Sequence, residues 1–439
     1  MRHLLPLAAG LALIFPPTLN TLAGEFPVPA ELPSRASMPD PLTMLDGLKV
    51  ASAEQWRELR RPELRALFEH YVYGRYPRGE AYRTQSPVDY RVRFEDPAAF
   101  GGAGTLREVE LTIGPPDFPK LNLLIATPND RTPAACFLGL NFGGNHLLVD
   151  DDRVALPRAW MPDRYPGVVN NRATAAGRGA QPESWPLAEA VKRGYAVATL
   201  YCGDVQPDRP FVREAMRATL AERSAENPNG DAVVEDDGAE TATLMWWAWG
   251  LHRAVDYLVN DKAIDPQRIA VVGHSRLGKA ALLAGALDER IALTVANQAG
   301  CGGSGPSRHD DKRAETVKII TDKFPHWFCT NFAEFGDDPT RLPIDQNGLV
   351  AMCAPRPVLV TAAADDVWAN PSGQFDVLRA ATPAYELLGA KGLAADAMPA
   401  PDAPLAGEGQ LGYWIRSGKH SMTPADWKVY MDFADRQMK

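Results

Sequence analysis

Residues 268–287 read RIAVVGHSRLGKAALLAGAL and contain the turn on which the fold prediction rests. The apolar run from Arg268 to Val272 predicts a short buried strand. Gly273-His274-Ser275 predicts a turn, and residues 276–287 predict a helix. Ser275 is therefore expected between strand and helix, with its hydroxyl exposed beside the N–H groups of the helix start.

A serine at such a junction is where α/β-hydrolases carry their nucleophile, because the helix start can stabilise a developing oxyanion. The usual Gly-x-Ser-x-Gly spacing requires glycine at position 277, where this chain has Leu277; the next glycine is Gly278. The motif alone therefore leaves a chance Gly-x-Ser open as an alternative. Arg276, directly after the serine, is expected to place its guanidinium over the oxyanion.

From about residue 134 the pattern is typical of a mostly parallel sheet covered by helices on both faces. The expected strands lie at 134–142, 195–201, 268–272, 291–296 and 357–362, with a helix over 240–259 whose tryptophans belong to the core. Upstream we expect a helix over 53–74 and antiparallel strands at 90–94, 106–113 and 121–126. We predict an α/β-hydrolase fold, a three-layer αβα sandwich with long insertions above the carboxyl ends of its strands, at about 144–186, 204–238, 300–347 and 390–410.

The order of further polar residues supports the nucleophile assignment. A hydrolase of this topology needs an acid after the next-but-one strand and a histidine after the last strand. Asp366 follows the strand at 357–362, and His420 follows an apolar run at 412–416 that precedes a final helix. We choose Asp366 over Asp365, because neighbouring side chains of an extended segment point to opposite sides.

Composition excludes several other functions. The net charge is −9 and the basic residues form no runs, so nucleic-acid binding is not expected. None of the five cysteines forms a Cys-x-x-Cys pair, and we expect neither a metal nor an organic cofactor. We interpret most cysteines as small buried hydrophobic residues; if one bridge forms, we expect Cys301–Cys329.

Residues 1–23 combine an early positive charge, an apolar stretch and small residues, as in a secretory signal peptide. We therefore expect a secreted or periplasmic protein, and no later segment predicts a membrane span. Residues 24–439 are expected to form a single catalytic domain, of which 24–110 supply an N-terminal arm, a helix and the first strand. We expect a monomer.

Several sequence blocks together resemble the glucuronoyl esterases, carbohydrate esterase family 15, and specifically their bacterial branch. The blocks occur in order along most of the chain: Asn141 to His146, Tyr201 to Asp204, Trp247 to Gly250, Gly273 to Lys279, Phe324 to Phe328, Asp366 to Trp368 and His420 to Met422.

The resemblance implies hydrolysis of the ester that joins glucuronic acid of xylan, often 4-O-methylated, to a lignin alcohol. It implies that Arg276 stabilises the oxyanion, that Lys279 and Glu315 bind sugar hydroxyls, and that Trp368 lines the uronate pocket. His146, which follows an early strand, fits an oxyanion or substrate loop.

Two positions depart from the family pattern. Many relatives carry the acid where this chain has Gln298, which leaves Asp366 as the triad acid and Gln298 as a candidate substrate contact. Fungal relatives carry a bridge between cysteines at the positions of His274 and Ser421, and both cysteines are absent here.

Two alternatives stay open. The same triad would serve an acetyl xylan, feruloyl or general carboxylesterase, although two cations near the nucleophile suit a sugar acid better. The second alternative is a catalytically inactive carbohydrate-binding relative, suggested by Gln298 and by the missing glycine at position 277.

Overall fold

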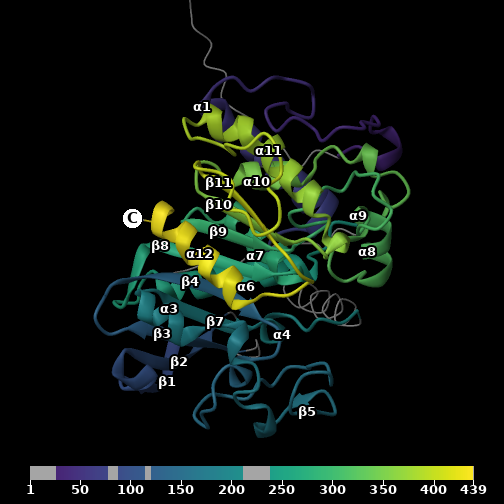
Figure 1. Ribbon diagram of the computed structural model, residues 1–439. Helices are drawn as coiled ribbons and strands as arrows, with labels where there is room; N and C mark the ends of the chain where they lie inside the picture. The colour runs from purple at the N-terminus through teal and green to yellow at the C-terminus, as the bar shows by residue number, and fades with distance from the viewer. Residues whose placement is uncertain (1–25, 78–87, 114–119, 211–237, 439) are drawn as a thin grey trace, which may run out of the picture.

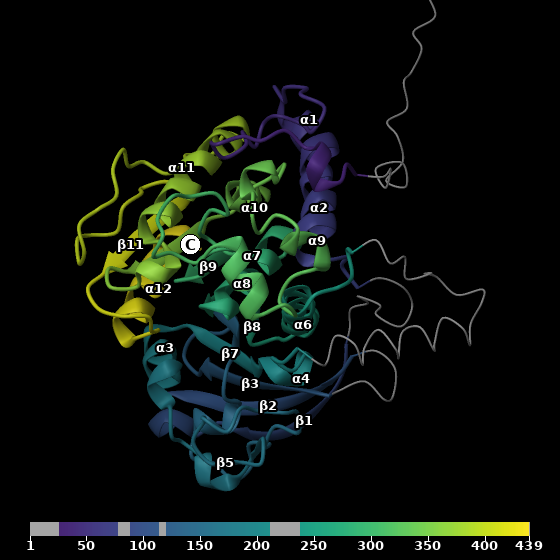
Figure 2. The same ribbon diagram turned by 90° about the vertical axis from the view of Figure 1, so that its right-hand side faces the viewer.

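The computed structural model describes residues 26–77, 88–113, 120–210 and 238–438. The expected signal peptide at 1–23 lies outside the described residues, as does most of the expected insertion at 204–238. Figure 1 shows a central sheet with helices packed against it, and Figure 2 shows the same chain from the side.

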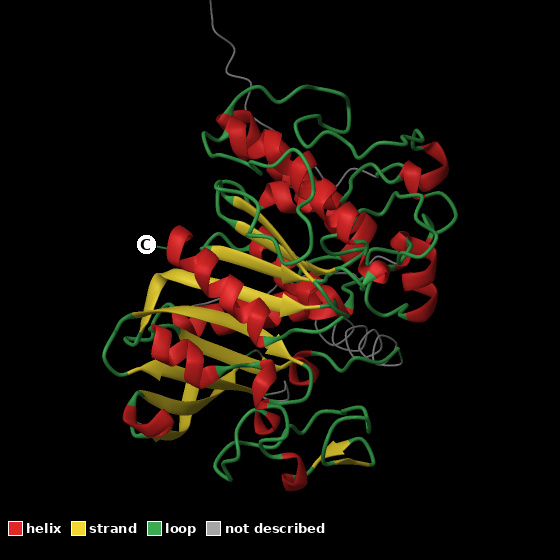
Figure 3. Cartoon of the chain, viewed as in Figure 1, coloured by secondary structure: helices red, strands yellow, loops and turns green. Residues whose placement is uncertain are grey.

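One nine-stranded sheet organises the described chain, in the order β1-β2-β3-β7-β4-β8-β9-β10-β11 (Figure 3). The six strands from β7 to β11 in this order run parallel, whereas β1, β2 and β3 are antiparallel. The strands are β1 Asp89–Asp96, β2 Gly104–Thr112, β3 Leu121–Pro128, β4 Ala134–Asn141, β7 Ala196–Tyr201, β8 Ile264–His274, β9 Leu293–Asn297, β10 Val358–Ala363 and β11 Leu411–Arg416.

This topology confirms the predicted fold class and each of the expected strands. The largest difference in the bounds is at β8, which begins at Ile264 instead of Arg268 because its first residue already pairs with Ala134 of β4. A separate small hairpin, β5 Val168–Val169 and β6 Arg172–Ala173, lies in the insertion after β4.

Helices cover both faces of the sheet because its central strands are apolar on both sides. In β8, Ile269 and Val271 face one core, while Ala270 and Val272 face the other. The helices of the first core are α6 Thr243–Leu258, α7 Arg276–Leu287, α10 Gln346–Met352 and α11 Pro371–Leu387. The second core is closed by α3 Leu187–Arg193 and α12 Pro424–Gln437, which lie in front of the sheet in Figure 1.

Shorter helices lie in the connections at the carboxyl edge of the sheet. They are α4 Cys202–Val205 after β7, and α8 Val317–Lys323 and α9 Thr330–Ala333 between β9 and β10. The expected insertions after β4, after β9 and before β11 are therefore present, and the one after β7 is described only as far as residue 210.

The N-terminal part forms the expected arm and helix. The helical segment runs from α1 Ala53–Gln55 through a π-helical stretch, Trp56–Arg60, into α2 Arg61–Phe68 and a second π-helical stretch, Glu69–Tyr73. The arm before it is held by backbone contacts with distant loops, such as Arg35 N–H to the Thr340 carbonyl at 2.9 Å. In Figure 1 this arm lies along the top of the molecule, beside α1 and α11.

All five cysteines are buried, as the favoured interpretation predicts. Cys301 is a free thiol, so the Cys301–Cys329 bridge is not formed. Burial raises the pKa of the Cys301 thiol, which keeps it protonated and unreactive.

No helix in the described residues is long and apolar enough to cross a membrane.

The tryptophans of α6 anchor the first core. Trp247 is 0% exposed, and its indole N–H donates to the carbonyl of Gln206 at 2.9 Å.

We expect Trp247→Ala to lower the free energy of unfolding by about 3–5 kcal/mol, because a large cavity would remain in a close-packed core. Urea denaturation followed by circular dichroism measures this change. Trp368→Ala, at a tryptophan that is 37% exposed, is the matched control and should change stability by less than about 1 kcal/mol. Equal losses in the two variants would contradict the assignment of Trp247 to the core.

Candidate active site

Ser275 lies on a sharp elbow between β8 and α7, as the sequence predicts. Its backbone has φ 57° and ψ −130°, in a region that residues other than glycine rarely adopt. The Ser275 N–H donates to the Asn297 carbonyl of β9 at 2.8 Å, which holds the turn against the neighbouring strand. Such strain is typical of functional sites and persists because the surrounding structure is rigid.

Two glycines make the elbow tight. A Cβ atom on Gly273 would lie 2.1 Å from the Leu277 carbonyl oxygen, and one on Gly278 would lie 2.9 Å from the Gly273 carbonyl oxygen. Leu277 itself is 1% exposed and packs into the core. The close approach that usually needs glycine two residues after the serine therefore falls on Gly278, which explains the shifted spacing.

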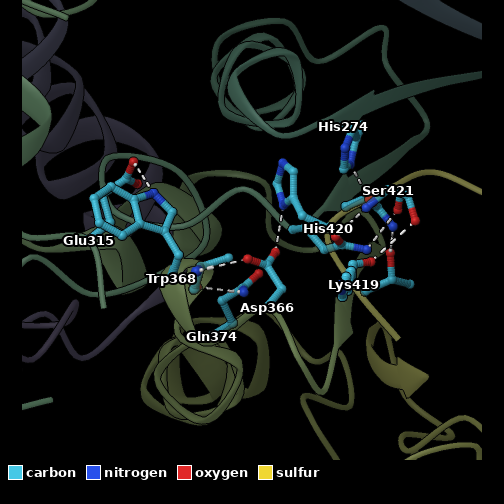
Figure 4. A network of polar contacts seen from close by, with 12 residues as sticks. His274, Glu315, Asp366, Trp368, Gln374, Lys419, His420 and Ser421 are labelled. Carbon is cyan, nitrogen blue, oxygen red and sulfur yellow. Dashed lines mark hydrogen bonds and ion pairs between the residues drawn. The ribbon is translucent and has the colours of Figure 1, made fainter. Parts of the chain in front are cut away.

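The structure brings His420 and Asp366 together. His420 Nδ1 lies 2.6 Å from Asp366 Oδ2, and the Asp366 side chain is only 4% exposed (Figure 4). Asp365 is exposed, and only its backbone N–H contacts the histidine loop, at the Gly418 carbonyl. The choice of Asp366 over Asp365 as the partner of His420 thus agrees with the geometry.

His274 packs against the ring of His420. The two ring centroids are 4.5 Å apart, and His274 Nδ1 lies 2.5 Å from Asn297 Oδ1. Burial, followed by the neighbouring His420, lowers the pKa of His274 to about 3. His274 is therefore neutral at ordinary pH. Because it directly precedes Ser275, its ring contact holds His420 near the serine without adding a charge. No hydrogen bond joins the Ser275 hydroxyl to His420 here; such bonds often tighten only when substrate binds.

The loop that carries His420 is held by a buried arginine. Arg416, at the end of β11, pairs with Asp426 of α12 at 3.1 Å. Its remaining amino groups donate to the carbonyls of Ser417, Lys419 and Ser421 at 2.8–3.0 Å. His420 therefore lies in a short loop whose backbone carbonyls accept hydrogen bonds from the Arg416 side chain.

Gln298, which the sequence predicts as a substrate contact, is a second brace of this loop. Its Nε2 donates to the Ser421 carbonyl at 2.9 Å, and its Oε1 accepts from the Ser421 N–H at 3.0 Å. Gln298 is 2% exposed, so its amide is occupied by the chain itself. A carboxylate could not donate to the Ser421 carbonyl, which gives the amide its own structural role here.

Lys279, Glu315 and Trp368 form one polar cluster. Lys279 Nζ lies 2.9 Å from Glu315 Oε2. The Trp368 indole N–H donates to Glu315 Oε1 at 3.0 Å (Figure 4). Lys279 lies one helical turn beyond the nucleophile, since its N–H donates to the Ser275 carbonyl at 3.1 Å. The cluster therefore lies close to Ser275 and offers a cation, a carboxylate and a partly exposed indole.

Arg276 lies at the start of α7 beside aromatic rings. Its guanidinium carbon is 4.5 Å from the centroid of the Phe142 ring, and its side chain is 17% exposed. The predicted oxyanion contact of Arg276 stays a prediction.

His146, which the sequence predicts in an oxyanion or substrate loop, is buried within the insertion after β4. The side chain is 0% exposed, and neither ring nitrogen has a hydrogen-bond partner. Burial lowers the pKa of His146 to about 4, which keeps the ring neutral. His146 packs inside the insertion after β4, where Gly144 and Gly177 leave room for its ring.

No group of three or more histidine, cysteine, aspartate or glutamate side chains in the described residues could hold a metal ion.

Comparison with known proteins places the chain among carbohydrate esterases. The family model described as "Glucuronyl esterase, fungi" matches residues 234–389. A carbohydrate esterase from an unknown prokaryotic organism is 41% identical over 93% of this chain and 91% of its own.

Two solved structures agree with this relationship. A promiscuous esterase of carbohydrate esterase family 15 from a marine bacterial metagenome is 40% identical, with a TM-score of 0.83 over 93% of this chain and 99% of its own. A glucuronoyl esterase from Solibacter usitatus is 33% identical, with a TM-score of 0.79 over 93% of this chain and 100% of its own.

We expect Asp366→Asn to lower kcat for a glucuronate ester by about 10³- to 10⁴-fold, because an amide neither selects the right tautomer of His420 nor stabilises its cation. Steady-state kinetics measure the loss. Asp365→Asn is the matched control and should retain the parent rate. A parent-like rate in Asp366→Asn would exclude Asp366 as the triad acid.

We expect Gln298→Met, which keeps the length but removes both amide bonds to Ser421, to lower kcat by at most about 30-fold, because two hydrogen bonds of about 1 kcal/mol each correspond to about 2 kcal/mol. The same assay compares it with Asp366→Asn. If the two variants lost activity to the same extent, Gln298 would have to act in the chemistry itself.

Proposed function

Because the chain belongs to carbohydrate esterase family 15, the family of the glucuronoyl esterases, we propose that it cleaves esters between glucuronic acid of glucuronoxylan, with or without 4-O-methylation, and lignin alcohols. The chain is a carboxylic ester hydrolase, and its family relatives include enzymes that act on glucuronate esters. The names of the relatives support the glucuronate ester, whereas the polysaccharide and the lignin alcohol are proposed here in addition.

The observation that carries the proposal is the charged cluster beside the nucleophile. The side chains of Lys279 and Glu315 are 4% and 6% exposed, and they form an ion pair with one another. Buried charges are costly to desolvate, so a site that keeps them is suited to a polar ligand. A uronate ring offers several hydroxyls to such a pair, whereas an acetyl group offers none.

The proposed reaction follows the serine esterase scheme. Ser275 Oγ attacks the ester carbonyl while His420 accepts its proton, and Asp366 stabilises the resulting imidazolium. Arg276 and backbone N–H groups at the start of α7 stabilise the oxyanion. His420 returns the proton to the leaving alcohol, a glucuronoyl ester of Ser275 remains, and a water activated by His420 hydrolyses it.

A less selective esterase is the second candidate, since one relative with 40% identity is described as promiscuous. It shares the triad and differs only in how strictly the cluster of Lys279, Glu315 and Trp368 selects the acyl group. An inactive carbohydrate-binding relative is disfavoured by the 2.6 Å contact between His420 and Asp366.

The cellular setting is part of the proposal as well. The pattern of residues 1–23 supports a secreted or periplasmic enzyme of xylan degradation, where an insoluble wall substrate would be met. We also propose that the enzyme acts as a monomer.

We expect purified enzyme to hydrolyse benzyl glucuronate and to leave 4-nitrophenyl acetate nearly untouched, with a ratio of kcat/KM of at least about 100, because the charged cluster can bind only the sugar acid. Ser275→Ala should lose turnover of both esters. The reverse preference would refute the proposed substrate class, and a paired galacturonate ester would show whether the 4-hydroxyl orientation is distinguished.

A further inference from the structure

Asp208 joins three segments of the site at one carboxylate. It lies in the connection after α4, at the carboxyl edge of the sheet. Its Oδ1 is 2.9 Å from His326 Nε2 and 2.7 Å from the Trp327 indole nitrogen, and its Oδ2 forms an ion pair of 2.7 Å with Arg276 Nε. The sequence pattern did not single out Asp208 as a functional residue.

We propose that Asp208 is a positioning residue that fixes the guanidinium of Arg276 for the oxyanion. The inference rests on the oxyanion role that the proposed function gives to Arg276. Asp208 does not touch the reacting atoms in this proposal and acts only through the arginine.

The arginine is confined on more than one side. Its guanidinium carbon lies 4.5 Å from the Phe142 ring centroid and 5.7 Å from that of Trp327. Trp327 is in turn stacked on Phe324, with ring centroids 3.9 Å apart and 4° between the planes. Because Asp208 accepts from the Trp327 indole, it orients both the ring and the guanidinium that packs on it.

The charge state of Asp208 suits this role. Burial works to raise its pKa, but the hydrogen bond from His326 and the charge of Arg276 hold the pKa below its ordinary value. Asp208 is thus a carboxylate, and Nε2 of His326 must carry the proton that lies between them. The carboxylate can then hold its three partners at once.

The arginine keeps donors for a substrate. Within the described residues no hydrogen bond leaves the Arg276 guanidinium, and the Nε–H points away from the line to Asp208, so that contact is purely ionic. A guanidinium has five N–H donors in a rigid planar fork. Asp208 therefore holds the guanidinium by charge at its Nε side, and the terminal amino groups have no hydrogen-bond partner among the described residues.

Two effects of Asp208 oppose each other, and they predict opposite signs. Its negative charge weakens the positive potential of Arg276, so that removal of the charge alone would speed the reaction. The ion pair with Asp208 also restricts the Arg276 side chain before the oxyanion forms. Without this pair, Arg276 would lose rotamer freedom during the reaction, and the reaction would be slower. Because the indole and imidazole N–H groups already neutralise part of the carboxylate, we expect the positioning effect to dominate.

The test is a double-mutant cycle of Asp208→Asn and Arg276→Ala, assayed on benzyl glucuronate. We expect Asp208→Asn alone to lower kcat by about 10-fold with KM changed by less than about twofold, since the oxyanion is absent from the bound ester and forms only as the serine attacks. In the Arg276→Ala background the same substitution should cost less than about twofold, because its only route of action is gone.

Asp261→Asn is the matched control. Asp261 also pairs with an arginine, Arg107, and its side chain is 4% exposed, but it lies before β8 at the opposite edge of the sheet. It should leave kcat unchanged. If circular dichroism shows Asp208→Asn to be unfolded, Asp208→Glu replaces it: the charge is kept, the added methylene displaces the guanidinium, and the same loss of kcat is expected.

An unchanged or increased kcat in the folded Asp208 variant overturns the inference, as does a full 10-fold loss in the Arg276→Ala background. Arg276→Ala by itself reports on the proposed function: a parent-like kcat there would remove the oxyanion role of Arg276, and the inference with it. A large loss in Arg276→Ala together with none in Asp208→Asn would remove the inference alone.

Discussion

The strained backbone of Ser275 is the constraint on which the rest of the site depends. A residue other than glycine with φ of 57° and ψ of −130° costs about 1–3 kcal/mol. The elbow persists because β8 and α7 are both buried in close-packed cores, and because Gly273 and Gly278 remove the atoms that would collide. The strained turn places Ser275 between the end of β8 and the start of α7, at the carboxyl edge of the sheet.

Loops at the same edge are held by buried charge pairs. Arg416 and Asp426 hold the loop of His420, Lys279 and Glu315 join α7 to the segment after β9, and Asp208 joins Arg276 to the loop after α8. Buried ion pairs contribute little net stability, because desolvation offsets most of their attraction. Their value here is geometric, since each pair fixes a side chain that the chemistry needs in one place.

The histidine loop is held by contacts on several sides. His274 packs on His420, and Gln298 and Arg416 bind the backbone of the same loop. Gln298 binds this loop through its neutral amide, whereas Asp366, in the segment after β10, contacts the His420 ring. Gln298 thus holds the loop without a charge, and Asp366 supplies the carboxylate that contacts His420.

Local patterns were sufficient to predict the strands, the elbow, the helix of α6 and the order of Ser275, Asp366 and His420. Apolar runs, turn residues and chain order act over a few residues or follow from topology, so they can be seen without coordinates. The burial of His146 and Gln298 could not be predicted in this way, because each follows a strand at the carboxyl edge of the sheet, yet its side chain is buried. That burial depends on which distant segment covers the residue.

The sequence by itself therefore determined the fold in outline and the order of the candidate residues Ser275, Asp366 and His420, since these depend on periodicity and order along the chain. The tertiary structure decided which carboxylate meets the base, what holds the base in place, and which residues surround the arginine beside the nucleophile. Asp208 and Trp327 are 119 positions apart and Gln298 and Ser421 are 123 apart, yet both pairs are hydrogen-bonded. Such contacts form because the parallel sheet brings the carboxyl ends of its strands to one edge. Loops that are far apart in the sequence therefore lie side by side there.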